Sequence, residues 1–401
     1  MKTKIRIGID ARMIRHSGIG TYLRNLLWEF QKLDHPRFEF TLFGSRKQFQ
    51  DSNGSYILRE VKNCESRSNT QHGTGITIYG RVGYEIRPFN QPIYSLSEQI
   101  AYFSKTRSVD LWHAPHYNAP FFSSSKLVVT IHDLIPLIFS GKFFSKPKHF
   151  YLANALKRIS EQAENIIAVS ECTKRDLVDL VKVPAERIRV IYEGVSSEFR
   201  PIGDLALLER VRSRYQIPKN ANLILYVGLI KPHKNLGVLT QAVKRLRREG
   251  KIDHKLVIVG KKDRTYPTGS EFLAEIHSDE DIIYRERVEH EDLPALYNLA
   301  SIFILPSLYE GFGLPVLEAL ACGIPVIVSN RASLPEVVGE AALLFEADSE
   351  ESLAEAILKL ARDEKLRQGL RQRGFERARL FSWNRMAQET LKVYEEASSC
   401  N

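Results

Sequence analysis

The chain has 401 residues, of which 43% are hydrophobic, and its formal net charge is +9. This length and apolar content fit two domains of about 150 to 200 residues each and exclude a largely disordered chain. No signal peptide and no apolar run of membrane-spanning length is found, and the cysteines lack C-x-x-C spacing, so we expect a cytoplasmic protein without a zinc site or a disulfide framework.

The basic excess lies in the first half of the chain. Residues 1–195 hold 28 Lys plus Arg against 18 Asp plus Glu, or +10, whereas the remainder holds 29 against 30, or −1. A basic domain fits peripheral contact with an anionic membrane or with a phosphate-bearing acceptor, and solvated surface charge is the alternative. Nucleic acid is disfavoured, because no recognisable nucleic-acid-binding module accompanies the charge.

Short apolar strands alternate with helical stretches along the whole chain, which is the pattern of a parallel sheet covered by helices. In the first half the predicted strands and helices are Ile5–Ile9, Tyr22–Leu33, Leu127–Ile131, His149–Ala163, Ile166–Val169 and Thr173–Val181. In the second half they are Leu223–Val227, Leu236–Arg248, Leu256–Val259, Ile302–Leu305, Pro325–Val328 and Ser352–Ala361. We therefore predict two similar α/β domains, with a boundary in the Gly, Ser and Pro-containing segment 193–201.

Two segments of the first half lack this pattern. Residues 44–80 are rich in Ser, Asn, Gln and Gly, which predicts a long loop that either selects an acceptor or is an inert insertion. Lys142–Tyr151 interleaves basic and aromatic residues, which fits either a membrane interface or internal packing.

Gly18 and Gly20 stand between the first predicted strand and helix, where bare backbone can approach a phosphate. A plain tight turn is the alternative. Leu23 occupies the place of the third glycine in G-x-G-x-x-G, so a dinucleotide cofactor is disfavoured.

Polar residues follow two further strands. His132 and Asp133 come at the carboxyl end of an apolar strand, the edge of a parallel sheet where ligands bind, although a lone histidine there is usually structural. Lys231 and Lys234 follow the strand ending at Val227 and could neutralise a departing diphosphate, or could be ordinary loop lysines.

The most informative segment runs from Pro306 to Glu318 and reads as strand, glycine turn and helix, with a proline in the first helical turn. Gly311 and Gly313 let backbone amides approach an anion at the helix N-terminus. Glu310 and Glu318 can each accept hydrogen bonds from paired hydroxyls, although either acid alone could be an ordinary loop or helix residue. A sugar attached to a nucleoside diphosphate carries both kinds of group.

This segment resembles the Glu-x7-Glu signature of the retaining nucleotide-sugar glycosyltransferases of family 4, and the resemblance covers nearly the whole chain. It implies the GT-B fold, in which two Rossmann-like domains face each other across a cleft. The domains would be an acceptor domain, residues 1–195, and a donor domain, residues 196–382, with residues 383–401 crossing back to the first.

The resemblance also implies residue roles. Glu310 would hold sugar hydroxyls and Glu318 the ribose diol. Donor diphosphate would meet the amides of Gly311, Phe312, Gly313 and Leu314 and the loop of Gly18 and Gly20. His132 would hydrogen-bond the transferring sugar, and Asp133 would orient the ring or support the turn.

The cationic positions match the family less closely. Lys234 matches the family's lysine, but Leu229 stands where relatives carry Arg, which leaves Lys231 as a substitute. Arg287 and Val288 lie in a segment resembling the one that lines the base, although Arg287 could also be a surface ion-pair partner.

The expected reaction is retaining transfer of a sugar to a hydroxyl of a lipid-linked or polysaccharide acceptor, without metal or other cofactor. Segments 9–12 and 227–236 look most like bacterial mannosyltransferases of surface polysaccharides, so GDP-mannose is the expected donor and a UDP-sugar the alternative. Front-face return and double displacement both stay open. A sugar phosphorylase, an epimerase and a non-catalytic sugar-binding protein are the rival classes.

Overall fold

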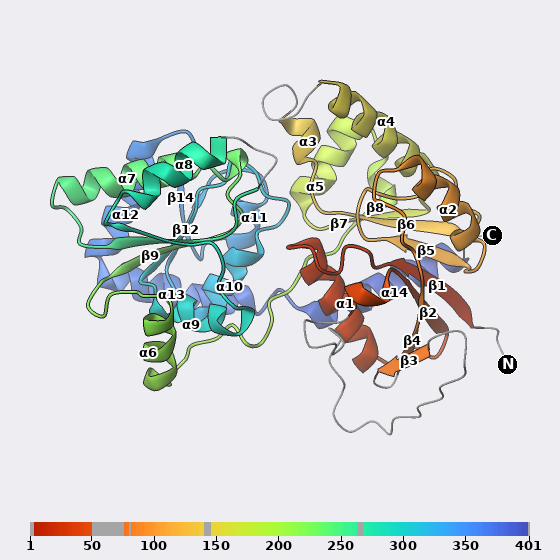
Figure 1. Cartoon of the computed structure of the whole chain (residues 1–401), viewed down its shortest axis with the longest axis horizontal. Coiled ribbons are helices and arrows are strands. Elements are labelled where there is room, and N and C mark those ends of the chain that lie inside the picture. The colour runs from red at the N-terminus through yellow and green to blue at the C-terminus, as the bar shows by residue number, and fades with distance from the viewer. Residues whose placement is uncertain (1–3, 50–75, 80–81, 140–145, 264–267, 400–401) are drawn as a thin grey trace. The chain divides into compact units, whose positions relative to one another are not determined.

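The computed structural model describes residues 4–49, 76–79, 82–139, 146–263 and 268–399. The chain forms two compact units (Figure 1). The first contains Met1–Glu193 and Trp383–Asn401, and the second contains Gly194–Ser382. The division after Glu193 lies within the segment 193–201 that interrupts the sequence pattern.

The first unit is built on one sheet with the strand order β3-β4-β2-β1-β5-β6-β7-β8. Neighbouring strands run parallel, except for the antiparallel pair β3 and β4. The strands are β1 (Ile5–Asp10), β2 (Phe38–Phe43), β3 (Ile76–Tyr79), β4 (Val82–Arg87), β5 (Leu111–Ala114), β6 (Lys126–Ile131), β7 (Asn165–Ala168) and β8 (Ile188–Val190).

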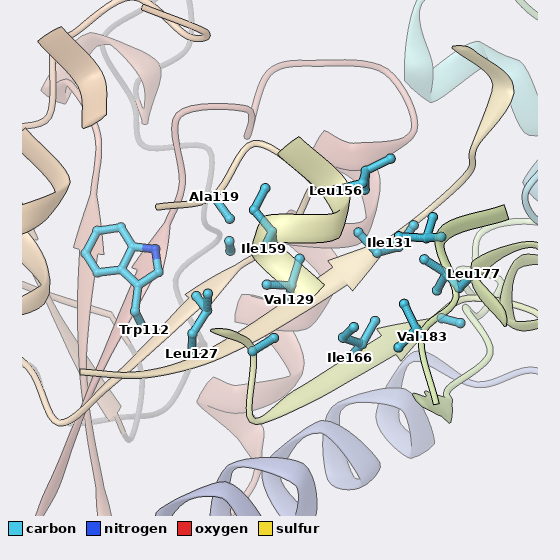
Figure 2. Packing of buried hydrophobic residues seen from close by; sticks show 14 of the residues in the cluster. Trp112, Ala119, Leu127, Val129, Ile131, Leu156, Ile159, Ile166, Leu177 and Val183 are labelled. Atoms are coloured by element: carbon cyan, nitrogen blue, oxygen red, sulfur yellow. The ribbon is translucent and has the colours of Figure 1, made fainter. Parts of the chain in front are cut away.

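Helices cover both faces of this sheet, because alternate strand residues point to opposite sides. Leu127, Val129 and Ile131 of β6 pack into a core with α4 (Lys146–Gln162), as Figure 2 shows. Thr130, which lies between Val129 and Ile131, points to the opposite face of the sheet and hydrogen-bonds Tyr22 of α1 (Ile19–Lys32). The core on the α4 side also takes in residues of α2 (Leu96–Thr106) and of the π-helical turn η2 (Leu177–Val181).

The C-terminal helix α14 (Trp383–Ser399) belongs to the first unit. It contacts α1, β5 and β6 on the Thr130 side of the sheet (Figure 1). The Tyr394 hydroxyl of this helix lies 2.6 Å from Nδ1 of His113 on β5. The predicted return of the C-terminal helix to the N-terminal domain is therefore confirmed.

The second unit has a parallel sheet with the order β11-β10-β9-β12-β13-β14. Its strands are β9 (Leu223–Val227), β10 (Lys255–Val259), β11 (Ile282–Arg285), β12 (Ile302–Leu305), β13 (Val326–Ser329) and β14 (Leu343–Phe345). Its helices are α6 (Leu205–Arg214), α7 (Leu236–Arg248), α8 (Thr268–His277), α9 (Leu293–Leu299), α10 (Leu314–Cys322), α11 (Leu334–Val338), α12 (Glu350–Arg362) and α13 (Glu364–Ala378).

The predicted class, two parallel α/β domains, is confirmed, with local differences. The helix predicted over Thr173–Val181 is α5 (Glu171–Asp176) followed by η2, which ends at Val181 and is capped by Lys182 with a left-handed φ of 64°. Of the predicted loop 44–80, residues 50–75 lie outside the described residues, and 76–79 form β3. Of Lys142–Tyr151, residues up to 145 lie outside the description and the remainder begins α4.

The helices found in the described ranges are all too short or too polar to cross a bilayer.

Candidate active site

In the second unit, the strand order reverses between β9 and β12, which are neighbours although they are not consecutive in the chain. Loops that follow such strands meet at one edge of a parallel sheet, where ligands of α/β proteins bind. Here the loop after β9 carries Lys231 and Lys234, and the loop after β12 leads to Glu310. The Leu308 N–H donates to the carbonyl oxygen of His233 over 2.8 Å, which joins the two loops.

Glu310 is buried and ionised. Its Oε1 lies 2.6 Å from Nζ of Lys234 and accepts a second hydrogen bond of 2.6 Å from the Ser307 hydroxyl. Burial alone would raise the pKa of Glu310, but the charge and hydrogen bond of Lys234, helped by Ser307, hold it below its ordinary value. A fixed carboxylate therefore stands at the strand reversal.

The glycine turn after Glu310 is held by Ser333, whose hydroxyl lies 2.9 Å from the carbonyl oxygens of both Glu310 and Phe312. Gly313 has a φ of 108°, and a Cβ there would lie 3.0 Å from the Leu334 side chain, so the position favours glycine. Helix α10 begins directly after it, at Leu314. Gly311, Phe312 and Gly313 thus form the turn that leads into the helix N-terminus at Leu314, and the Phe312 ring is buried.

Glu318 differs from Glu310 in its electrostatics. It lies on α10 and accepts a hydrogen bond of 2.7 Å from the Tyr297 hydroxyl of α9. Burial raises the pKa of Glu318 to about 7, and the Tyr297 bond offsets only part of this effect. Glu318 is therefore about half ionised near neutral pH.

The other predicted residues of this unit have separate partners. Nζ of Lys231 lies 3.2 Å from Oδ2 of Asp263, which follows β10. Arg287 and Val288 follow β11, at the edge of the sheet, where Arg287 is 68% exposed at its side chain and pairs with Glu289 at 3.3 Å. The contacts thus bring Lys234 and Glu310 together, whereas Lys231 and Arg287 each face an acid of their own.

In the first unit, His132 and Asp133 follow β6. Nδ1 of His132 lies 3.1 Å from Oε1 of Glu193, and Nε2 lies 3.0 Å from the carbonyl oxygen of Pro115. Oδ1 of Asp133 accepts a 3.1 Å hydrogen bond from the Ile135 N–H, at the start of the short helix α3 (Ile135–Ile138). The Asp133 carboxylate is thus bonded to the backbone at the start of α3.

The two glycines near α1 have different surroundings. Gly18 precedes the helix with a left-handed φ of 61°, and a Cβ there would meet open space. Gly20 lies inside the helix, and a Cβ there would lie 2.6 Å from the carbonyl oxygen of Ile14. Position 20 thus requires glycine, because the backbone of the preceding loop at Ile14 lies too close for a Cβ atom.

A small hollow lies at the end of β1 and β5, where the strand order of the first sheet reverses. Its lining is Asp10, Arg12, Met13, Ile93, Pro115, His116 and Asn118, and we call it the β1/β5 hollow. Arg12 is buried, bonds Asp10 at 2.5 Å and Glu98 at 2.6 Å, and lies 3.7 Å above the Phe89 ring centroid. Sequence reasoning did not single out this lining as a site.

Sequence reasoning also missed the partners of the predicted residues: Ser307, Tyr297, Ser333 and Glu193. Ser307 lies three residues before Glu310, so its position in the motif was a usable signal. The others come from separate loops or helices, and no spacing in the chain points to them.

Comparisons with known proteins agree with the two-unit architecture. Residues 16–199 match the family model described as Glycosyltransferase Family 4, and residues 209–377 match Glycosyl transferases group 1. The chain is similar in structure to sucrose-phosphate synthase from Thermosynechococcus elongatus, with a TM-score of 0.74, 20% identity and coverage of 98% of this chain and 99% of that one. It is also similar to Anabaena HepE solved with UDP and glucose, with a TM-score of 0.73, 18% identity and coverage of 98% and 100%.

The two α/β domains have the GT-B fold of these neighbours, and the two family models identify the chain as a glycosyltransferase. Among sequence relatives, the O-antigen chain mannosyltransferase B of Escherichia coli is 32% identical over 285 residues, which cover 71% of this chain and 74% of the relative. The chain belongs to the family 4 glycosyltransferases.

Proposed function

We propose that this glycosyltransferase moves mannose from GDP-mannose to a hydroxyl of a lipid-linked or polysaccharide acceptor, with retention at the anomeric carbon. The observation that carries the choice of sugar is the 32% identity to an O-antigen chain mannosyltransferase over 71% of the chain. A UDP-sugar is the alternative donor, because HepE, which shares the fold, was solved with UDP and glucose.

The Lys234–Glu310 pair supports a role at the reacting sugar. Glu310 is ionised and oriented by two hydrogen bonds, so its carboxylate has remaining lone pairs for sugar hydroxyls. Lys234 uses one of its three N–H donors on Glu310, which leaves two for phosphate oxygens. Lys234, with Lys231, would thereby supply positive charge to the departing diphosphate, and we propose a metal-independent reaction on this basis.

Helix α10 supports the position of the nucleotide. Its N-terminal amides at Gly313 and Leu314 provide donors for the diphosphate, and its dipole favours the negative charge. Glu318 lies one turn further along the same helix and would accept both ribose hydroxyls when it is ionised. Arg287 and Val288 would lie on the base side of this donor site.

The first unit carries a surface that fits an anionic membrane. Leu96, Ile100 and Phe103 of α2 are 80%, 71% and 46% exposed and recur at the spacing of one helical face. The chain segment beside α2 adds Phe122, 65% exposed, and α4 adds Phe150, 72% exposed. We call these five residues the α2/α4 apolar surface.

Hydrogen bonds and charges support the continuity and the partner of this surface. Gln99 of α2 bonds the backbone of Ala119 and Phe121, and the Arg158 guanidinium of α4 lies 4.9 Å from the Phe122 ring centroid. Lys105, Arg107 and Lys157 add positive charge, while Glu161 is paired with Arg158 at 3.8 Å. Exposed apolar groups among cations fit a surface of anionic lipid headgroups, which would also bring the enzyme to a lipid-linked acceptor.

Donor and catalytic role can be tested with one variant. Wild type should be stabilised against heat by GDP-mannose more than by UDP-glucose, and it should release GDP from GDP-mannose. Glu310→Ala should lose release while retaining GDP affinity, and Glu340→Ala, an exposed change in the same unit, should behave as wild type. Stabilisation by UDP-glucose alone would refute mannose transfer, and unchanged release in Glu310→Ala would refute the role of Glu310.

A further inference from the structure

Glu193 is a buried carboxylate that no motif marks. It is 4% exposed and stands at the end of the first unit, three residues after β8. Its Oε1 lies 3.1 Å from Nδ1 of His132. A buried carboxylate is costly unless it is paired, so the His132 ring is part of what keeps Glu193 in place.

The His132 ring is held at both nitrogens. Nε2 lies 3.0 Å from the carbonyl oxygen of Pro115, and a carbonyl can only accept, so Nε2 carries a hydrogen. Nδ1 then shares a hydrogen with the Glu193 carboxylate. The Tyr22 ring packs edge-on against the imidazole, with 4.9 Å between ring centroids, which fixes the ring plane as well.

Two neighbouring histidines and one tyrosine carry no charge near neutral pH. Burial lowers the pKa of His113 to about 3 and the pKa of His116 well below its ordinary value, so neither ring is charged near neutral pH. Burial also raises the pKa of Tyr22, which stays protonated. Glu193 is therefore the acid that lies against Nδ1 of His132.

We propose that Glu193 is a positioning residue for glycosyl transfer, acting through His132. Glu193 at Nδ1 orients the ring, so that the Nε2–H points to the carbonyl of Pro115, which lines the β1/β5 hollow. A substrate oxygen would then replace the Pro115 carbonyl as the acceptor of that hydrogen. This inference rests on the proposed function, which makes His132 a residue that contacts the sugar.

The test compares Glu193→Gln with Glu29→Gln, a matched change of a buried carboxylate in the same unit. In ¹⁵N-histidine NMR, the Nδ1 resonance of His132 should be the same in wild type and in Glu29→Gln but shifted in Glu193→Gln, in which an amide replaces the carboxylate at that nitrogen. The kcat for GDP release from GDP-mannose should fall about 10- to 100-fold in Glu193→Gln with little change in KM, by analogy with the loss found when the hydrogen-bond partner of a metal-bound histidine is removed.

An unchanged Nδ1 resonance of His132 in Glu193→Gln would overturn the proposal, and so would a fall in kcat without that change, because Glu193 would then act on the fold alone. Circular dichroism should show the same unfolding midpoint for wild type and both variants to within a few degrees. If wild type releases no nucleotide from GDP-mannose or UDP-glucose, the proposed function fails, while the Nδ1 resonance still decides whether Glu193 acts on the His132 ring.

Discussion

Glu318→Gln is expected to abolish a pH dependence of donor binding. Because the pKa of Glu318 is about 7, roughly one tenth of the side chains are ionised at pH 6 and about nine tenths at pH 8. An ionised carboxylate accepts two hydroxyl hydrogens, whereas the protonated acid is itself a donor. If the ionised form is the one that binds the ribose diol, apparent affinity follows its population and rises about tenfold from pH 6 to pH 8.

Isothermal titration calorimetry with GDP-mannose at pH 6, 7 and 8 measures this change, and the donor's two phosphates keep the same charge over that range. Glu318→Gln should bind with one affinity at all three values. At pH 8 it should bind about 10- to 100-fold more weakly than wild type, since a hydrogen bond to a charged group is worth roughly 1.5 to 3 kcal/mol. A wild-type affinity that is the same at pH 6 and pH 8, or a tenfold change that persists in Glu318→Gln, would refute this reasoning.

Stability provides a second, independent measurement on the same variant. The pKa of Glu318 is raised by folding from its ordinary 4.5 to about 7, so the folded chain binds more protons than the unfolded chain between these values. The free energy of unfolding contributed by this group therefore falls as pH rises through that window. Glu318→Gln lacks this pH-dependent loss of stability. In urea unfolding, the free energy of unfolding of Glu318→Gln minus that of wild type should therefore be larger at pH 8 than at pH 5.

Three further changes test other parts of the molecule. Lys234→Met should destabilise the second unit by about 1 to 3 kcal/mol in urea unfolding, because it leaves the Glu310 carboxylate buried without its cation; an unchanged stability would contradict the pairing. Ile100→Ser should weaken binding to vesicles containing phosphatidylglycerol about tenfold in flotation assays, and equal binding would argue against the α2/α4 apolar surface. Gly20→Ala should cost about 1 to 3 kcal/mol through its clash, whereas Gly237→Ala, at the same place in α7 but in open space, should not destabilise.

Much of the fold could be predicted from the sequence, because the signals are local. The apolar runs at Ile5, Leu127 and Leu223 became strands of parallel sheets, and the turn before α10 formed where Gly313 and Pro315 stand. Two glycines, two acids and a helix start within 13 residues are enough to indicate a phosphate and hydroxyl site. The sequence did not indicate the antiparallel pair of β3 and β4, because β3 has only four residues and lies in the segment predicted as a loop.

Tertiary structure decided what each predicted side chain does. Lys231 and Lys234 look alike in the sequence, yet they have different partners. The packing of β9 beside β12 places Lys234 in an ion pair with Glu310, whereas Lys231 pairs with Asp263.

Glu310 and Glu318 are also alike in the sequence, but their pKa values differ in the structure. Lys234 holds the pKa of Glu310 below its ordinary value, whereas Glu318 is buried without a cation and its pKa is raised. Amino-acid order alone determines the period of apolar residues and the turn chemistry, and these specify strands, helices and loops. Protonation and pairing depend on the distance between groups far apart in the chain and on their removal from water, which exist only once the sheet has brought its loops to one edge.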